Sequence, residues 1–246
     1  MGFLGHLEEL RGTLMKCAVV FLIFAVLIGI YLRESSDVLM WPWESVRAEF
    51  PQFSVKQGTN EVTGIFSMTI NIFIVGGVAA SLPFWFFFVS QFVAPALTKK
   101  ELKVLVPACF SAFLLFLIGA SFGFFLLVPS TVRVAYELHE YMGVDPRWTV
   151  ESYFGLLLWL VLGVGVTFEF PLLIVLACYM GLVDVATLRK YRRHAFVFFF
   201  IVSAIVTPTP DPFTQTAFAV PLYLLYEAAI LVSHFLGRRK KLAEVS

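Results

Sequence analysis

Long apolar runs separated by short charged segments constrain this chain more than any other feature. The hydrocarbon core of a bilayer is about 30 Å thick, so a helix needs about 20 apolar residues to cross it. The first run is too long for the apolar region of a signal peptide, and no small-residue cleavage site follows it. The pattern predicts an all-α polytopic membrane protein with six transmembrane helices, at 14–32, 63–92, 104–128, 153–180, 195–206 and 213–236.

The composition also indicates a membrane environment. Hydrophobic residues make up 59% of the 246 residues and charged residues 14%, against about 45–50% and 25% in ordinary globular chains. A small soluble domain keeps most of its residues near the surface and cannot bury this much apolar area. The composition excludes a soluble enzyme, a disordered regulator and a disulfide-stapled secreted module. We expect residues 1–246 to form a single integral membrane domain.

The fifth run is too short to cross a bilayer of ordinary thickness, because its 12 residues give roughly 18 Å of helix. Prolines at positions 208, 210 and 212 follow it and cannot continue a helix. We therefore expect the last two helices to be short and to form a hairpin whose tip stops inside the membrane thickness, within a concave, glove-like bundle. A re-entrant loop that leaves four full spans is the alternative. The full length of the sixth run favours six spans.

Two further expectations concern the second run and the outer loops. Gly76, Gly77 and Pro83 lie inside the second run, so the helix there is expected to be broken. The loops at 33–62 and 129–152 are rich in Trp, Tyr, Phe and Pro. Aromatic rings are favoured at the membrane interface, so we expect these loops to be ordered caps that lie on it.

The distribution of Lys and Arg predicts the orientation. Thirteen of the 18 basic residues lie in the N-terminus, the second loop, the fourth loop and the C-terminus, and five lie on the other side. The positive-inside rule then places both termini in the cytoplasm. Glu227 lies in an apolar run close to the basic C-terminus, so we expect it to pair with Arg238 or Arg239.

Glu169 is the most unusual polar residue within the apolar runs. A carboxylate at the centre of a membrane helix costs about 2.5–3.5 kcal/mol, and Pro171 frees backbone carbonyls close to it. The protonated side chain could donate a single hydrogen bond to a neighbouring helix. Alternatively, the group faces a cavity or a partner helix. Gln215 and Thr216 are candidate neighbours within the chain.

The N-terminus and the second loop carry acidic residues on a face that is otherwise basic. Leu7, Leu10 and Leu14 share one helical face, so an amphipathic lead-in along the membrane is expected. Glu9 precedes the first run, and Glu101 lies in the second loop. Chance could explain both, because surface Glu is common. No metal-ligand spacing of His or Cys occurs, so we expect neither a metal nor a cofactor.

Five motifs in order resemble the TatC family, the integral receptor subunit of the twin-arginine protein translocase. The N-terminal His6-Leu-Glu-Glu-Leu-Arg11 is similar to that family's "HLxELR" opening, and Phe92 to Glu101 resembles its "F-x-x-P-A-L…E" loop. Phe168-Glu-Phe-Pro171 resembles its "F-E-x-P" motif. The stretch from Thr207 to Gln215 is similar to its "TP-x-D-x-x-x-Q" hairpin, and Pro221 to Glu227 resembles its closing "P-x-x-x-L-Y/F-E".

The resemblance implies a function without catalysis. Such proteins bind twin-arginine signal peptides of folded precursor proteins at the cytoplasmic face and assemble with single-span TatA and TatB subunits. Transport uses the proton-motive force, and the resemblance implies a multi-pass protein of the bacterial inner membrane. No phosphate-binding G-x-x-x-x-G-K-[ST] motif is present in the sequence. Further copies of the chain and membrane lipids are expected partners, and nucleic acid is not.

The resemblance also implies roles for individual residues. Glu9 and Glu101 would supply carboxylates for the two guanidinium groups, since Arg–carboxylate contacts are charge-assisted and can be bidentate. Phe92 and Leu97 would flank the apolar part of the signal. The implied residues of the signal-peptide site are Glu9, Arg11, Phe92, Pro95, Leu97 and Glu101, those of partner-helix docking are Glu169 and Gln215, and Pro42 and Asp211 have structural roles on the outer side.

Two functions of other classes compete with this interpretation. A small-solute or proton-coupled transporter would suit a mid-membrane Glu beside a proline, but six spans show no clear internal repeat. An intramembrane hydrolase would need a Ser/His pair or paired carboxylates within the apolar runs, and the sequence has neither. Retention of single-span partners and of a twin-arginine peptide on purification would separate a translocase receptor from both.

Overall fold

A computed structural model describes residues 3–50, 63–96, 99–146, 148–209 and 211–245. These ranges contain no strand and are almost entirely helical, which confirms the all-α class. A 3-10 turn and a π-helical segment, Ala94–Ala96 and Gly123–Leu127, occur between α-helices. The α-helices are α1 (Phe3–Ile30), α2 (Leu32–Glu49), α3 (Gly64–Val93), α4 (Lys99–Phe122), α5 (Val128–Met142), α6 (Val150–Thr167), α7 (Phe170–Tyr179), α8 (Val185–Lys190), α9 (Arg192–Val206) and α10 (Pro212–Val245).

Five helical stretches within the described residues are long and apolar enough to cross a membrane, namely Gly5–Ile30, Gly64–Phe92, Pro107–Met142, Val150–Tyr179 and Pro212–Gly237. The remaining predicted span, the fifth in the sequence, corresponds to α9, which has 15 residues and is therefore about 22 Å long. Its predicted shortness is confirmed. The last helix differs from the expected short one, because α10 continues beyond its apolar part through the basic C-terminal residues and reaches 34 residues.

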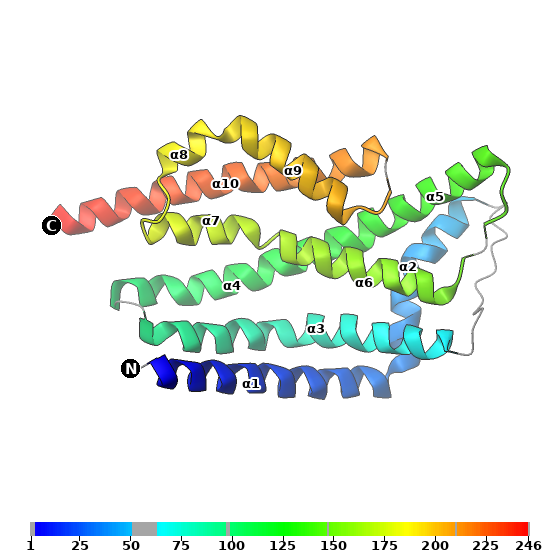
Figure 1. Cartoon of the computed structure of the whole chain (residues 1–246), viewed down its shortest axis with the longest axis horizontal. Helices are drawn as coiled ribbons and strands as arrows, with labels where there is room; N and C mark the ends of the chain where they lie inside the picture. The colour runs from blue at the N-terminus through cyan, green and yellow to red at the C-terminus, as the bar shows by residue number, and fades with distance from the viewer. Residues whose placement is uncertain (1–2, 51–62, 97–98, 147, 210, 246) are drawn as a thin grey trace.

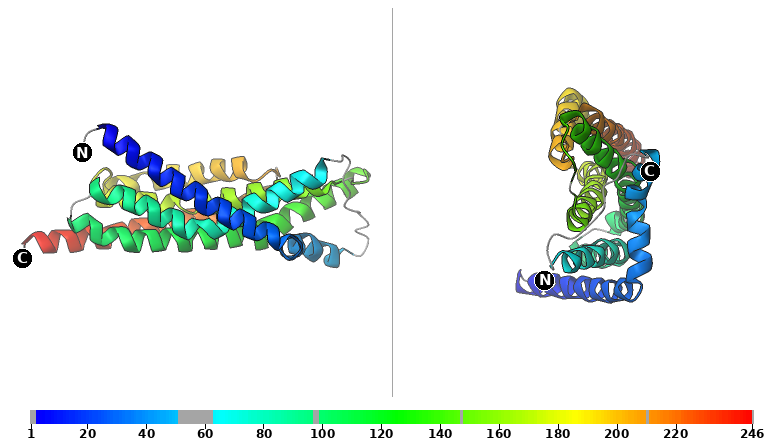
Figure 2. Two further views of the ribbon diagram at one scale, coloured as in Figure 1. Left: turned by 90° about the horizontal axis from the view of Figure 1, so that it is seen from below. Right: turned by 90° about the vertical axis from the view of Figure 1, so that its right-hand side faces the viewer.

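The long helices run along the long axis of the molecule, and both chain termini lie at the same end (Figure 1). We call this end the terminal end. The α3–α4 connection and α8 also lie there, whereas α2 crosses the bundle at the opposite end. Seen end-on, α1 and α3 form one edge, α9 and α10 form the other, and α2 spans one side between them (Figure 2). The helices thus form a curved wall, with α6 between its two edges.

The first helix is continuous from Phe3 to Ile30, so the predicted amphipathic lead-in does not lie separately along the membrane. Leu7, Leu10 and Leu14 do share a face, and this face is exposed. The residues between them and the apolar run contain no proline, and nothing interrupts the hydrogen-bond ladder of the helix. The lead-in is therefore the first part of the spanning helix.

The third helix is also continuous, so the predicted break at Gly76, Gly77 and Pro83 is wrong. The two glycines permit close packing of α1 on α3: a Cβ at Gly77 would lie 2.9 Å from the Phe21 ring, and one at Gly76 would lie 3.0 Å from Ile28. Small residues at a helix crossing allow such an approach. The glycines serve the contact between helices and do not end the helix.

The predicted outer loop at 129–152 is largely helical, because α4 continues through the π-helical segment into α5. The Val128 amide donates to the carbonyl of Gly123, five residues back. The wider π turn accommodates the missing amide of Pro129, so the proline does not end the helix. The helix ends at Met142, where Gly143 adopts a φ of 66°.

The other predicted cap, 33–62, is ordered as α2 up to Glu49, and residues 51–62 lie outside the described ranges. Glu49 accepts a hydrogen bond from Arg133 of α5 in an ion pair. The Trp43 ring lies 5.6 Å from the ring of Trp148, just before α6, and 5.6 Å from that of Tyr153, at the start of α6. Aromatic contacts thus hold α2 against the bundle.

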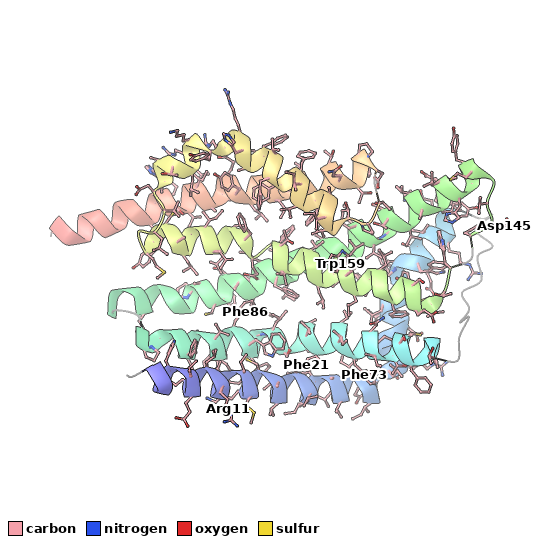
Figure 3. All side chains as sticks on the ribbon, viewed as in Figure 1. Arg11, Phe21, Phe73, Phe86, Asp145 and Trp159 are labelled. Atoms are coloured by element: carbon pink, nitrogen blue, oxygen red, sulfur yellow. The ribbon has the colours of Figure 1, made fainter. Side chains whose placement is uncertain are left out.

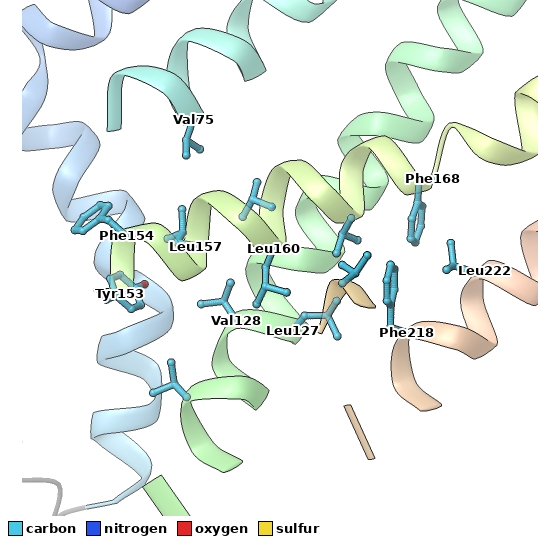
Figure 4. Packing of buried hydrophobic residues seen from close by; sticks show 14 of the residues in the cluster. Val75, Leu127, Val128, Tyr153, Phe154, Leu157, Leu160, Phe168, Phe218 and Leu222 are labelled. Carbon is cyan, nitrogen blue, oxygen red and sulfur yellow. The ribbon is translucent and has the colours of Figure 1, made fainter. Parts of the chain in front are cut away.

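The core of the bundle is built around α6. Leu157, Leu160 and Val164 are fully buried along one helix, with Leu127 beside them (Figure 4). Close approach of α4 to α6 depends on glycines, because a Cβ at Gly119 would lie 2.7 Å from the Phe168 ring. This crossing fixes the position of the C-terminal end of α6, where the helix is interrupted before α7.

Candidate functional site

Two of the predicted site residues, Glu9 and Phe92, lie on either side of His6 at the terminal end. The rings of His6 and Phe92 are stacked, with centroids 4.6 Å apart and planes inclined by 20°. Glu9 Oε2 lies 3.9 Å from His6 Nδ1 and accepts no hydrogen bond from the described residues, although this atom is shielded from solvent. The Trp85 indole donates to the Cys17 carbonyl at 3.0 Å, which fixes the register of α3 on α1.

The other predicted signal-peptide residues are placed less closely. Pro95 is exposed in the 3-10 turn after α3. Arg11 points away from α3 and lines a shallow apolar groove on α1 with Leu7 and Leu10 (Figure 3). Leu97 and the side chain of Glu101 lie outside the described residues, although the backbone of Glu101 belongs to the first turn of α4.

Glu169 lies in the interruption between α6 and α7. The Glu169 amide bonds to the Val166 carbonyl at 3.1 Å, and its own carbonyl accepts from Leu172 and Leu173. Pro171 has no amide to donate to the carbonyl four residues back, and its ring clashes there, which explains why the α-helix stops. In the last turn of α6, the Thr167 hydroxyl donates to the Gly163 carbonyl at 2.6 Å.

The carboxyl of Glu169 has unused hydrogen-bonding capacity. Its Oε1 atom is shielded from solvent and has no partner among the described residues, while the residue as a whole is half-buried. Phe168 beside it is 3% exposed and packs its ring near those of Phe122 on α4 and, through it, Phe218 on α10. The backbone is therefore held firmly while the carboxyl retains an oxygen that can accept a donor.

Gln215 does not meet Glu169 by any hydrogen bond in the described part of the chain. Its amide donates to the Phe200 carbonyl of α9 at 3.1 Å, and its backbone carbonyl accepts from Ser203 at 2.7 Å. Trp159 of α6 donates to the Val206 carbonyl at 2.8 Å. Trp159 of α6 thus satisfies a carbonyl at the end of α9, as a helix end within a membrane requires, while Gln215 joins α10 to the middle of α9.

The α9–α10 turn lies short of the ends of α3, α5 and α6 (Figure 1). A cavity of about 440 Å³ at this turn is lined by Ala204, Thr207, Pro208, Thr209 and Gln215. Thr207 is buried and donates its hydroxyl to the Ser203 carbonyl. The short hairpin therefore presents a polar recess instead of an apolar tip.

Asp211 caps the last helix. Its Oδ2 accepts from the Thr214 amide at 2.6 Å, with Pro212 as the first helical residue, which is a favoured arrangement at a helix N-terminus. Partial burial alone would raise the pKa of Asp211. The hydrogen bond from the Thr214 amide and the nearby hydroxyls of Thr209 and Thr214 favour the charged carboxylate and outweigh that effect, so the pKa is lowered.

Pro42, the other predicted structural residue, is buried inside α2. A proline within a helix leaves carbonyls of the preceding turn without an amide partner. Tyr153 at the start of α6 donates its hydroxyl to one carbonyl of that turn, Leu39, at 2.8 Å. Pro42 thus lies where α2 is joined to α6.

Glu227 pairs with Arg192, whereas the side chains of the expected partners, Arg238 and Arg239, lie outside the described residues. Glu227 Oε2 accepts from Arg192 at 2.8 Å, and Oε1 accepts from Tyr223 at 3.0 Å. Arg192 opens α9, so the pair joins the two helices of the hairpin near the terminal end. The basic run at 189–193 indicates in the sequence that a partner for Glu227 could lie there. Only the packing of α9 on α10 shows that Arg192 is that partner.

The chain is similar to known proteins over nearly its whole length. A family model described as "Sec-independent protein translocase protein (TatC)" matches residues 5–221. The Koribacter versatilis protein of that name is 31% identical, over 98% of this chain and 89% of its own. The Escherichia coli K12 protein of that name is 32% identical, over 94% and 87%. A crystal structure of a twin-arginine translocase receptor, TatC, in DDM aligns with a TM-score of 0.76 and 28% identity, over 93% and 99%.

Proposed function

The chain belongs to the TatC family of Sec-independent protein translocase proteins, and on this premise we propose that it binds twin-arginine signal peptides of folded precursors at its terminal end. This end faces the cytoplasm, and residues 1–246 act as one integral membrane domain. The family is one of translocase components and not of catalysts. The single observation that carries the proposal is the grouping of Glu9, His6 and Phe92 where α1 begins and α3 ends.

The chemistry of this group suits a signal peptide with two adjacent arginines. Glu9 Oε2 has no hydrogen-bond donor among the described residues, and a guanidinium supplies several donors in a fixed fork. Glu101, in the first turn of α4, supplies the second carboxylate. Phe92 presents an aromatic ring, and Leu97 lies in the same connection, so the apolar part of the signal follows them. Arg11, on the outer face, shapes the entrance and makes no contact with the arginines.

Charge reversal tests the proposal. Photocrosslinking from the α3–α4 connection to a twin-arginine precursor is expected to fall at least about tenfold in Glu9→Lys and Glu101→Lys, since each loses a charge-assisted contact worth about 1.5–3 kcal/mol. Glu8→Lys is the matched control, because Glu8 is the exposed neighbour of Glu9 with the same charge, and it should crosslink as wild type. Unchanged crosslinking in the Glu9→Lys/Glu101→Lys double variant contradicts the proposal.

A second part of the same function is assembly with single-span TatA- and TatB-like proteins at Glu169 and the hairpin recess that holds Gln215. The free Oε1 of Glu169 and the polar lining of the recess support it, because each offers hydrogen bonds that lipid cannot use. Further copies of the chain join the receptor complex, and the proton-motive force drives transport. No cofactor and no nucleic acid takes part. Co-purification of single-span partners tests this assembly.

A further inference from the structure

We propose that a cavity at the end of the bundle away from the termini binds the headgroup of an aminophospholipid, a lipid that carries both a phosphate and a primary ammonium. The cavity has a volume of about 550 Å³ and lies where α1 ends, α2 begins and α3 makes its first turns. This volume is within the range of small-molecule sites, about 300–1,000 Å³. The site lies at the opposite end from His6 and Phe92 and is independent of the function proposed above.

The lining of the cavity has a charged part and an apolar part. Arg33, Glu34 and Asp37 come from the first two turns of α2, and all three are exposed. Ile65 and Met68, from the first turns of α3, supply apolar surface. Ile30, Leu32 and Ile72 complete the apolar part, and Ser36 and Thr69 add two hydroxyl groups. A ligand with a charged head and an apolar body matches this division.

The charges of the lining select the headgroup. No ion pair within 4.0 Å joins Arg33 to Glu34 or Asp37 in the part of the chain that the structure describes. An anion alone would meet two carboxylates, and a cation alone would meet the guanidinium. A phosphate binds a guanidinium with two parallel hydrogen bonds, and a primary ammonium has three donors for carboxylates. A quaternary ammonium has no N–H group and cannot make the second contact.

The depth of the cavity matches the position of lipid headgroups. Ile30 is the last residue of the first candidate span, and the second begins at Gly64. The charged residues therefore follow directly after the apolar part of α1, at the level where the bilayer changes from acyl chains to headgroups. Ile65 and Met68 lie at the start of the second span, where acyl chains begin. The lipid would be held in the leaflet away from the termini.

Native mass spectrometry of the full chain tests the proposal, with phosphatidylethanolamine, phosphatidylcholine and phosphatidylglycerol of identical acyl chains. We expect wild-type protein to retain phosphatidylethanolamine about tenfold more tightly than the other two, since one charge-assisted contact is worth at least that factor. Arg33→Gln/Asp37→Asn should remove this preference. Arg47→Gln/Glu44→Gln, a matched pair of exposed charges on the same helix outside the cavity, should keep it.

Three results would overturn the proposal. Equal retention of the three lipids by wild-type protein would show that the charges select no headgroup, and this outcome needs no variant to fold. An equal loss in both double variants would place the lipid elsewhere. Binding of free glycerophosphoethanolamine as tight as that of the lipid would show that Ile65 and Met68 contact no acyl chain. The lipid preference is measured without precursor, so its failure leaves the signal-peptide proposal untouched.

Discussion

At the scale of single residues, Glu169 combines a fixed backbone with a carboxyl that has a free acceptor. The interruption at Pro171 and the buried Phe168 hold the backbone, and Oε1 has no partner among the described residues. The residue as a whole is half-buried, so a donor on an incoming helix that reached this carboxyl would satisfy an acceptor that the described residues leave unpaired. Such a gain is larger in lipid than in water, because lipid offers no alternative partner.

We therefore predict that Glu169→Ala weakens crosslinking of a TatB-like helix to α7 by about fivefold to tenfold, which corresponds to one hydrogen bond of about 1–1.5 kcal/mol. Glu169→Gln should lose less, because the amide keeps an acceptor and gains donors. Precursor crosslinking at the terminal end serves as the control and should stay unchanged. Equal partner crosslinking in Glu169→Ala and wild type would show that the carboxyl does not mark the docking site.

Asp211 supports a pH-dependent prediction at the same scale. Its pKa is lowered in the folded protein, so the carboxylate stabilises the fold fully above its ordinary pKa, and this stability is lost as the pH falls through the lowered value. Asp211→Ala should destabilise the chain by about 1 kcal/mol near neutral pH, as loss of a helix cap does. The difference in Tm between the two proteins in detergent should shrink below about pH 4. A difference that stays constant down to pH 2 would contradict the charged cap.

At the scale of elements, some glycines allow two helices to cross closely, whereas others lie at no crossing. Gly165 of α6 lies against Phe116 of α4, and a Cβ there would be 2.5 Å from the ring. Gly155 lies in the same helix with nothing within 4 Å of the corresponding position. The same substitution at the two sites therefore has opposite consequences for packing.

We predict that Gly165→Ala destabilises the protein by about 1–3 kcal/mol, because overpacking shifts α4 away from α6. Gly155→Ala should be neutral or stabilising by about 0.5–1 kcal/mol, since alanine favours the helix. Thermal unfolding of both variants in one detergent measures the difference. Equal Tm values for the two variants would show that the crossing relaxes without cost.

At the scale of the whole molecule, the helices differ too much in length to match a single membrane thickness. The α9–α10 turn stops short of the other helices at its end (Figure 1). A bilayer that meets a short element becomes thinner locally or admits water. The polar lining of the cavity at the turn favours water.

We predict that a cysteine at Ala204, in a chain whose three native cysteines are replaced, reacts with a membrane-impermeant thiol reagent in liposomes. Ala204 lines the cavity, whereas its neighbour Ile205 is 68% exposed at the same depth and does not. Ala204→Cys should react about tenfold faster than Ile205→Cys, since lipid excludes the thiolate form that reacts. No reaction at either site would show a dry recess, and equal fast reaction would place the whole turn outside the bilayer.

The sequence by itself determined the class of the protein and the positions of most spans, because the length of an apolar run is a local property matched to the bilayer. It also indicated the freed carbonyls near Pro171, since proline acts on its own turn, and the short α9. It did not predict that the span at 153–180 is divided into α6 and α7. It did not show that α3 is unbroken or that α4 continues into α5. Glycine and proline end a helix only if the surroundings do not compensate, and at Gly77 and Pro129 a neighbouring helix and a π turn do.

Only the tertiary structure decided which side chains meet. Phe92 stacks on His6, Arg192 pairs with Glu227, and Gln215 bonds to α9 and not to Glu169. Each contact joins helices whose relative rotation and register are set by packing along their whole length, as at Gly76 and Gly77. Spacing in the sequence carries no record of that register. The charged residues of the lipid cavity lie close together along α2, but they share a cavity with Ile65 and Met68 only because α2 crosses the end of α1 and the start of α3.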